Sequence, residues 1–265
     1  MRQAIEAYLA LRRTSGFELK NDEYLLRSYA RFAAERGESH VRTPTAITWA
    51  AQSTSVVQRD VRLKTVCRFA LFVHLEDEGH ELPPAEHFAC HKTRRVPYIY
   101  SDTELEHLIQ AALQLGPPGA LRPYPYATII ALLSATGLRI SEALALRLCD
   151  VSSESLLIRK TKFRKSRLVP LHDTVVLGLE RYFTRRRQFG TDHDCIFITD
   201  KGQPLSYGAV HPTFQKLLRV AKLWPAPGMP RPHLHDLRHR FAVRALETAA
   251  QSPGSPSQHM LALAT

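Results

Sequence analysis

The sequence predicts a mainly α-helical protein with a small antiparallel β-sheet, and three observations lead to this fold class. Apolar residues recur at helical spacing through most of the 265 residues. Residues 155–171 instead combine two β-favouring runs with a basic middle, which is the pattern of a hairpin. A basic, proline-containing segment at residues 91–100 separates two parts of different charge, so two domains are expected.

Residues 1–90 are predicted to form a helical domain. Two stripes of apolar residues have helical spacing: Leu25, Tyr29, Phe32 and Ala33 in one, and Val66, Phe69, Ala70 and Val73 in the other. We expect both stripes to face a common core. Between them, a helix is expected to begin near the proline of RTPTAIT, and the helix of the second stripe is expected to end at Gly79.

Residues 91–100 are predicted to be a basic linker, and the charge differs on its two sides. Residues 1–90 carry equal numbers of basic and acidic side chains, so the whole net charge of +11 lies in residues 91–265. A one-sided basic excess is expected of a surface that meets polyphosphate, although ribosomal, membrane-surface and other basic proteins share it. Nucleic acid is therefore one candidate partner on charge alone.

Residues 101–265 are predicted to form the second domain. A helix is expected to begin with Ser101 or Asp102 as its cap, because Glu104 follows closely in a capping-box pattern. The stretch YATIIALLSATGLRISEALALRL predicts a helix, a break at Thr136 and Gly137, and a second helix from about Ser141. After the hairpin, CIFITDKGQPLSYGAV is expected to hold another short strand before a helix at residues 206–222.

Several classes of protein are not expected from this sequence. No apolar run approaches the roughly 18 residues of a membrane span, and the N-terminus does not resemble an export signal. The four cysteines, Cys67, Cys90, Cys149 and Cys195, form no C-x-x-C pair. Neither a disulfide framework nor a cysteine zinc site is therefore indicated, and we expect a cytoplasmic protein without membrane contact.

Arg139 is the first candidate for chemistry, because it follows a glycine break at the start of a predicted helix. A guanidinium there could add its donors to the unpaired N–H groups of the helix end and form an anion pocket. The alternative is a solvated charge, which is the usual condition of an arginine in the first turn of a helix.

The predicted hairpin tip is the second candidate. Its nine residues RKTKFRKSR include six basic ones and no acid: Arg159, Lys160, Lys162, Arg164, Lys165 and Arg167. Such a tip could be a solvated loop, or it could enter a DNA groove and carry a lysine to a phosphate or a leaving-group oxygen.

The third candidate is HLHDLRHRF, within a stretch that contains one acid and many basic groups. His235 and Arg238 share one helix face, and Asp236 and Arg240 share another. The alternatives are a basic helix face with one core histidine, or a zinc helix, because HDLRH has His-x-x-x-His spacing. An arginine beside a dication and the lack of an obvious third ligand weigh against zinc.

Taken together and in this order, the three segments resemble the tyrosine recombinase, or phage integrase, family. That family has an Arg within Ala-Thr-Gly-Leu-Arg-x-Ser-Glu, here ATGLRISE; a Lys in a hairpin that ends Arg-x-Val-Pro-Leu, here TKFRKSRLVPL; and His-x-x-Arg-His, here HDLRH. The resemblance implies an N-terminal helical core-binding domain at residues 1–90 and a recombinase-like catalytic domain at residues 101–265. Double-stranded DNA is the implied partner, and self-association on DNA is implied for the full-length family member.

The resemblance also implies roles for individual residues. Arg139 and Arg238 would hold the scissile phosphate, Lys162 would protonate the 5′-oxygen leaving group, and His235 would assist proton transfer. No metal or other cofactor is expected, because guanidinium charge takes its place. Further DNA contacts are expected from the basic residues of the linker, the hairpin and the HDLRH helix: Lys92, Arg94, Arg95, Arg159, Lys160, Arg164, Lys165, Arg167, His239 and Arg240.

One part of the family pattern is missing. The family places a His or Trp and the Tyr nucleophile beyond His-x-x-Arg, whereas the last of the nine tyrosines here is Tyr207. We therefore expect a truncated recombinase with a C-terminally incomplete catalytic domain, in which strand cleavage lacks its attacking atom. The alternative is a DNA-binding remnant that occupies recombination sites without cutting them.

Overall fold

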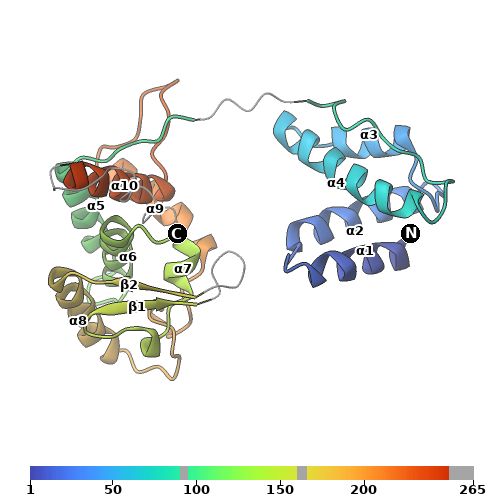
Figure 1. Cartoon of the computed structure of the whole chain (residues 1–265). Coiled ribbons are helices and arrows are strands. Elements are labelled where there is room, and N and C mark those ends of the chain that lie inside the picture. Colours follow the sequence, from blue (N-terminus) through green and yellow to red (C-terminus); the bar gives the residue numbers. More distant parts are fainter. Residues whose placement is uncertain (90–94, 160–165, 251–265) are drawn as a thin grey trace. The chain divides into compact units, whose positions relative to one another are not determined.

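The computed structural model describes residues 1–89, 95–159 and 166–250. The chain divides into two compact units, Met1–Arg94 and Arg95–Thr265 (Figure 1). Each unit has a hydrophobic core of its own. The structure is mostly helical with one two-stranded antiparallel sheet, which confirms the predicted fold class. In the part of the chain that it describes, no helix is long and apolar enough to cross a lipid bilayer.

The first unit contains four helices: α1 (Arg2–Thr14), α2 (Lys20–Ala34), α3 (Thr43–Ala51) and α4 (Val56–His74). The second apolar stripe is buried, and so is the first apart from Phe32, which packs at the edge of the core. Tyr29 and Trp49 meet edge to face at the centre, with ring centroids 5.5 Å apart. The predicted core is therefore confirmed.

The end of α4 differs from the prediction. The helix ends at His74 rather than at Gly79. The reason is a local turn, in which Asp77 Oδ1 accepts the N–H of Gly79 at 2.8 Å. An aspartate that binds the backbone two residues later stabilises a turn in competition with helix.

The second unit is built around α6. Its helices are α5 (Asp102–Leu113), α6 (Pro123–Thr136), α7 (Ile140–Leu144), α8 (Asp173–Arg187), α9 (Tyr207–Val220) and α10 (Leu234–Ala250), with a short 3-10 helix at Leu148–Asp150. Most of α6 is apolar, and it packs against α5, α8 and α10 (Figure 1). The predicted capping box is present, since Ser101 Oγ accepts the Glu104 N–H at 3.1 Å and Glu104 Oε2 accepts the Ser101 N–H at 2.8 Å.

The predicted hairpin is confirmed by β1 (Ser155–Ile158) and β2 (Arg167–Pro170), which pair antiparallel with Ile158 opposite Arg167. The short strand expected in CIFITDKG is a wrong prediction for the described residues. Only isolated bridges occur there, between Arg147 and Cys195 and between Ile198 and Pro204. Pro204 has no N–H, so it cannot extend a ladder.

Gly137 joins α6 to α7 and brings α10 close. It has a φ of 64° and its N–H donates to the Leu133 carbonyl at 3.0 Å, which ends α6 as predicted. A Cβ at this position would lie 2.3 Å from Cδ1 of Phe241 in α10. Glycine is therefore required both by the left-handed backbone and by the approach of α10.

Candidate active site

Arg139 is held at the N-terminus of α7. The residue before it, Leu138, is buried, and Arg139 itself is the N-cap with an extended backbone (φ −72°, ψ 146°). Its side chain is 44% exposed. The backbone of Arg139 is thus anchored in the core while its guanidinium reaches solvent.

Glu142 is the acid of this site, and sequence reasoning missed its role. Its carboxylate is only 8% exposed and accepts from the backbone N–H of Arg139 at 2.9 Å and from Arg139 Nη1 at 3.0 Å. Arg167 forms a two-pronged pair with the same carboxylate at 3.1 and 2.9 Å. Burial raises the pKa of Glu142, but the hydrogen bonds from Arg167 and Arg139 outweigh it, so the pKa lies below its ordinary value. The i, i+3 spacing of Arg139 and Glu142 is the sequence signal that could have found this contact.

Arg238 reaches the same place from α10. Its Nη1 donates to the carbonyl of Gly137, so α10 is attached to the joint between α6 and α7. Partial burial lowers the pKa of Arg238, and the positive charge of Arg139 lowers it further. A bound anion would stabilise the charges of both neighbouring guanidinium groups.

His235 lies on the same side of α10 as Arg238. Its ring meets that of His239 edge-on, with centroids 4.8 Å apart. Loss of water around the ring lowers the pKa of His235, and the charges of His239, Arg238 and Arg139 act in the same direction. The imidazole is therefore protonated less readily than an ordinary histidine, and a bound anion would favour its protonation.

The other side of α10 is attached to residues 95–102. Asp236 is buried and accepts the N–H of His233 at 2.7 Å and Nη2 of Arg95 at 3.0 Å. Arg240 donates through Nε to the Tyr100 carbonyl at 3.0 Å and through Nη2 to Asp102, and its side chain is 11% exposed. These contacts favour a structural task for Arg95 and Arg240.

The structure thus brings Arg139, His235 and Arg238 together. Among the expected DNA contacts, Arg159 is exposed, with its Nε 2.5 Å from Asp150 Oδ1. His239 is partly buried. The other described candidates bind internal partners: Arg95, Arg167 and Arg240. The remaining candidates lie outside the described residues: Lys92, Arg94, Lys160, Lys162, Arg164 and Lys165.

The zinc alternative has no third ligand in the part of the chain that the structure describes. There, two groups of three side chains are close enough to share an ion: His40, Asp77 and His80, and His193, Asp194 and Cys195. Neither includes His235 or His239. His80 Nδ1 accepts the Val41 N–H at 3.0 Å, so a neutral His80 carries its proton on Nε2 and has no lone pair there for a metal.

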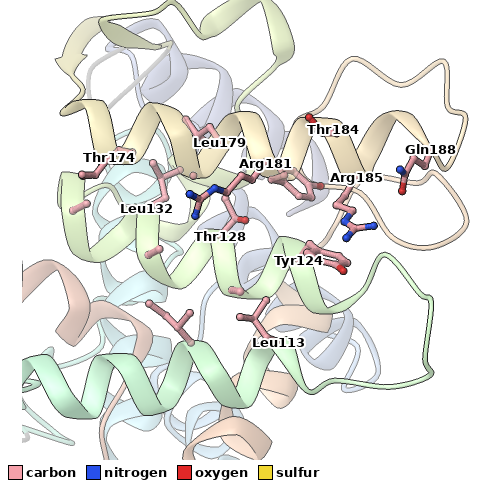
Figure 2. Close-up of a pocket in the computed structure, with 17 residues that line it drawn as sticks. Leu113, Tyr124, Thr128, Leu132, Thr174, Leu179, Arg181, Thr184, Arg185 and Gln188 are labelled. Atoms are coloured by element: carbon pink, nitrogen blue, oxygen red, sulfur yellow. The ribbon is translucent and has the colours of Figure 1, made fainter.

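An apolar groove of about 770 Å³ lies elsewhere in the second unit, between α5, α6 and α8. Figure 2 shows Leu113, Leu132 and Leu179 along it, with Arg181 and Arg185 among its lining side chains. Arg139, His235 and Arg238 are not among the residues that line it. The basic site and the groove are separate features of this unit.

Three comparisons with known proteins fit this geometry. Residues 100–253 match the model of the phage integrase family. The Sinorhizobium fredii protein "Putative integrase/recombinase y4rB" is 35% identical, over 100% of this chain and 87% of its own length. A second protein of that species, "Putative integrase/recombinase y4rE", is 31% identical, over 99% of this chain and 86% of its own length. The structure of a lambda integrase dimer bound to a COC′ core site aligns with a TM-score of 0.60 at 17% identity, covering 98% of this chain and 76% of that one, which shows a shared fold. The chain therefore belongs to the phage integrase, or tyrosine recombinase, family.

Proposed function

We propose that this protein binds duplex DNA and that Arg139, Arg238 and His235 together hold one phosphodiester group during site-specific recombination. The observation that carries the proposal is geometric: Arg238 of α10, one helical turn from His235, binds the carbonyl of Gly137, two residues before Arg139 at the start of α7. The basic excess of residues 91–265 and the similarity to integrase/recombinase proteins support DNA as the partner.

The chemistry follows from charge. Attack on a phosphodiester places additional negative charge on the non-bridging oxygens, and the forks of Arg139 and Arg238 would stabilise that charge. His235 would hydrogen-bond the phosphate and take up a proton as the charge develops. Lys162 is proposed, from the resemblance alone, to protonate the 5′-oxygen leaving group.

The finer contacts are also part of the proposal. Exposed Arg159 and partly buried His239 are proposed to contact the DNA backbone, together with Lys92, Arg94, Lys160, Arg164 and Lys165. The lambda integrase neighbour is a dimer on its DNA, and we propose that this protein also self-associates on DNA. A DNA partner is also the reason for proposing that it acts in the cytoplasm.

A second candidate function is binding without cleavage. The two functions differ in the covalent step, which needs a nucleophile in addition to the proposed phosphate clamp. A DNA substrate that traps covalent intermediates separates the two functions. A covalent adduct formed by residues 1–265 would exclude binding without cleavage.

The proposed phosphate clamp can be tested on duplex DNA that the protein itself selects. Duplex DNA is selected from a randomised library with the 265-residue protein, and phosphate-ethylation interference is mapped on the selected sequence. We expect Arg139→Met and Arg238→Met to lose the interference at one and the same phosphate. Arg147→Met, which removes another ion-paired arginine, is the control. If the two variants lose interference at different phosphates, or if the wild-type protein selects no duplex, the proposed function is wrong.

A further inference from the structure

The carboxylate of Glu142 is saturated with donors. A carboxylate offers about four acceptor positions. Arg167 takes one on each oxygen, and the backbone N–H and Nη1 of Arg139 take the other two. With its side chain 8% exposed, Glu142 has little access to water as an alternative partner.

Arg139 and Arg167 share this acid unequally. Arg167 is the first residue of β2, opposite Ile158, and its fork binds both carboxylate oxygens, which is the strongest arrangement for such a pair. Among the described residues, Arg139 has one side-chain hydrogen bond to Glu142, through Nη1. The Nε and Nη2 donors of Arg139 are left for another anion.

We propose that Arg167 is a positioning residue, which keeps Arg139 available to a DNA phosphate by occupying the carboxylate of Glu142. The inference rests on the proposed function, and it gives Arg167 a task other than the direct DNA contact expected from the sequence. It also explains why an acid can lie within an anion site, since the fork of Arg167 offsets its charge.

The physical reason is competition for Glu142. Without the fork of Arg167, the carboxylate can turn both oxygens toward Arg139 and form a two-pronged pair with it. Such a pair would withdraw Arg139 from the phosphate. A lysine at position 167 would keep the charge but could not bind both oxygens in the same plane, so it should not replace the arginine.

The test uses the DNA selected above and four variants: Arg167→Met, Arg167→Lys, Glu142→Gln and the double variant Arg167→Met with Glu142→Gln. We expect Arg167→Met and Arg167→Lys to lose ethylation interference at the same phosphate as Arg139→Met and to bind about tenfold more weakly. The double variant should recover most of that affinity, because a glutamine keeps an oxygen for the Arg139 N–H but no longer competes as an anion. Arg147→Met remains the control for loss of an ion-paired arginine.

Three outcomes overturn the inference. The first is loss of ethylation interference, in the Arg167 variants, at a phosphate other than the one that Arg139→Met affects. That result would make Arg167 a direct DNA contact. The second is an unchanged interference pattern in both Arg167 variants, and the third is a double variant no better than Arg167→Met. Thermal unfolding checks that each variant is folded. If Arg167→Met is unfolded, the result with Arg167→Lys decides whether the inference holds. If Arg139→Met itself loses no ethylation interference at any phosphate, the proposed function is wrong. This result differs from the three outcomes that overturn only the inference about Arg167.

Discussion

At the scale of the residue, His235 is expected to make DNA binding depend on pH. Its pKa lies below the ordinary value because the ring is short of water and faces positive charges. A phosphate placed beside the ring reverses the sign of the nearest charge and raises this pKa. Binding of DNA should therefore be accompanied by proton uptake.

The predicted result is an affinity for DNA that increases as the pH falls from about 8 to about 5, the range in which histidines titrate. The sign follows from linkage, since a group with a higher pKa in the complex than in the free protein favours binding at low pH. His235→Gln should flatten the dependence, which is measured by fluorescence anisotropy with labelled duplex. An equally steep profile in His235→Gln would assign the effect to another group.

At the scale of the element, α10 is held from two sides, by the joint after α6 and by residues 95–102. This double attachment places Arg238 and His235 on a rigid helix, as a phosphate clamp requires. Both attachments can be broken one at a time.

Gly137→Ala should destabilise the second unit by more than about 2 kcal/mol, because an alanine is strained at positive φ and its Cβ would overlap Phe241. The matched control is Gly178→Ala within α8, where a Cβ meets nothing within 4 Å. That change should stabilise by about 0.5–1 kcal/mol, since alanine is the better helix former. Denaturant unfolding measures both, and equal effects of the two substitutions would contradict the packing of α10 against Gly137.

Asp236→Asn should cost about 1–3 kcal/mol, because the Oδ2 atom that accepts from both His233 and Arg95 loses its negative charge and Arg95 is left without its charged partner. Limited proteolysis should then cut more rapidly near residues 95–100, which the helix no longer holds. A variant with wild-type stability and wild-type protease resistance would show that this attachment does not fix α10.

At the scale of the whole molecule, DNA affinity should fall steeply with salt, because contacts to phosphates release bound counterions. Arg159→Gln should reduce the slope of log affinity against log salt by about 0.9, the value for one lost contact. Arg240→Gln should leave the slope unchanged, since the Arg240 side chain is bound to Tyr100 and Asp102 and is 11% exposed, whereas that of Arg159 is 53% exposed. A reduced slope for Arg240→Gln would restore it as a DNA contact.

Periodicity and caps predicted much of this molecule, since the apolar stripes, the capping box, the break at Gly137 and the hairpin depend on neighbours in sequence. The ordered motifs also indicated that Arg139, His235 and Arg238 belong to one site. The partners of Arg167 and Arg240 could not be predicted, because Glu142 and Asp102 reach them only through tertiary packing. A basic residue looks the same in sequence whether its charge meets a phosphate or an internal carboxylate.

The central claim is that Arg139 and Arg238 hold one phosphate together, and a neutral methylphosphonate at that phosphate tests it most directly. We predict that the replacement weakens binding of the wild-type protein by at least about tenfold. It should have a much smaller effect on Arg139→Met and on Arg238→Met, because each has already lost part of the clamp. Wild-type affinity that is unchanged by methylphosphonate at every position of the selected duplex would contradict the account.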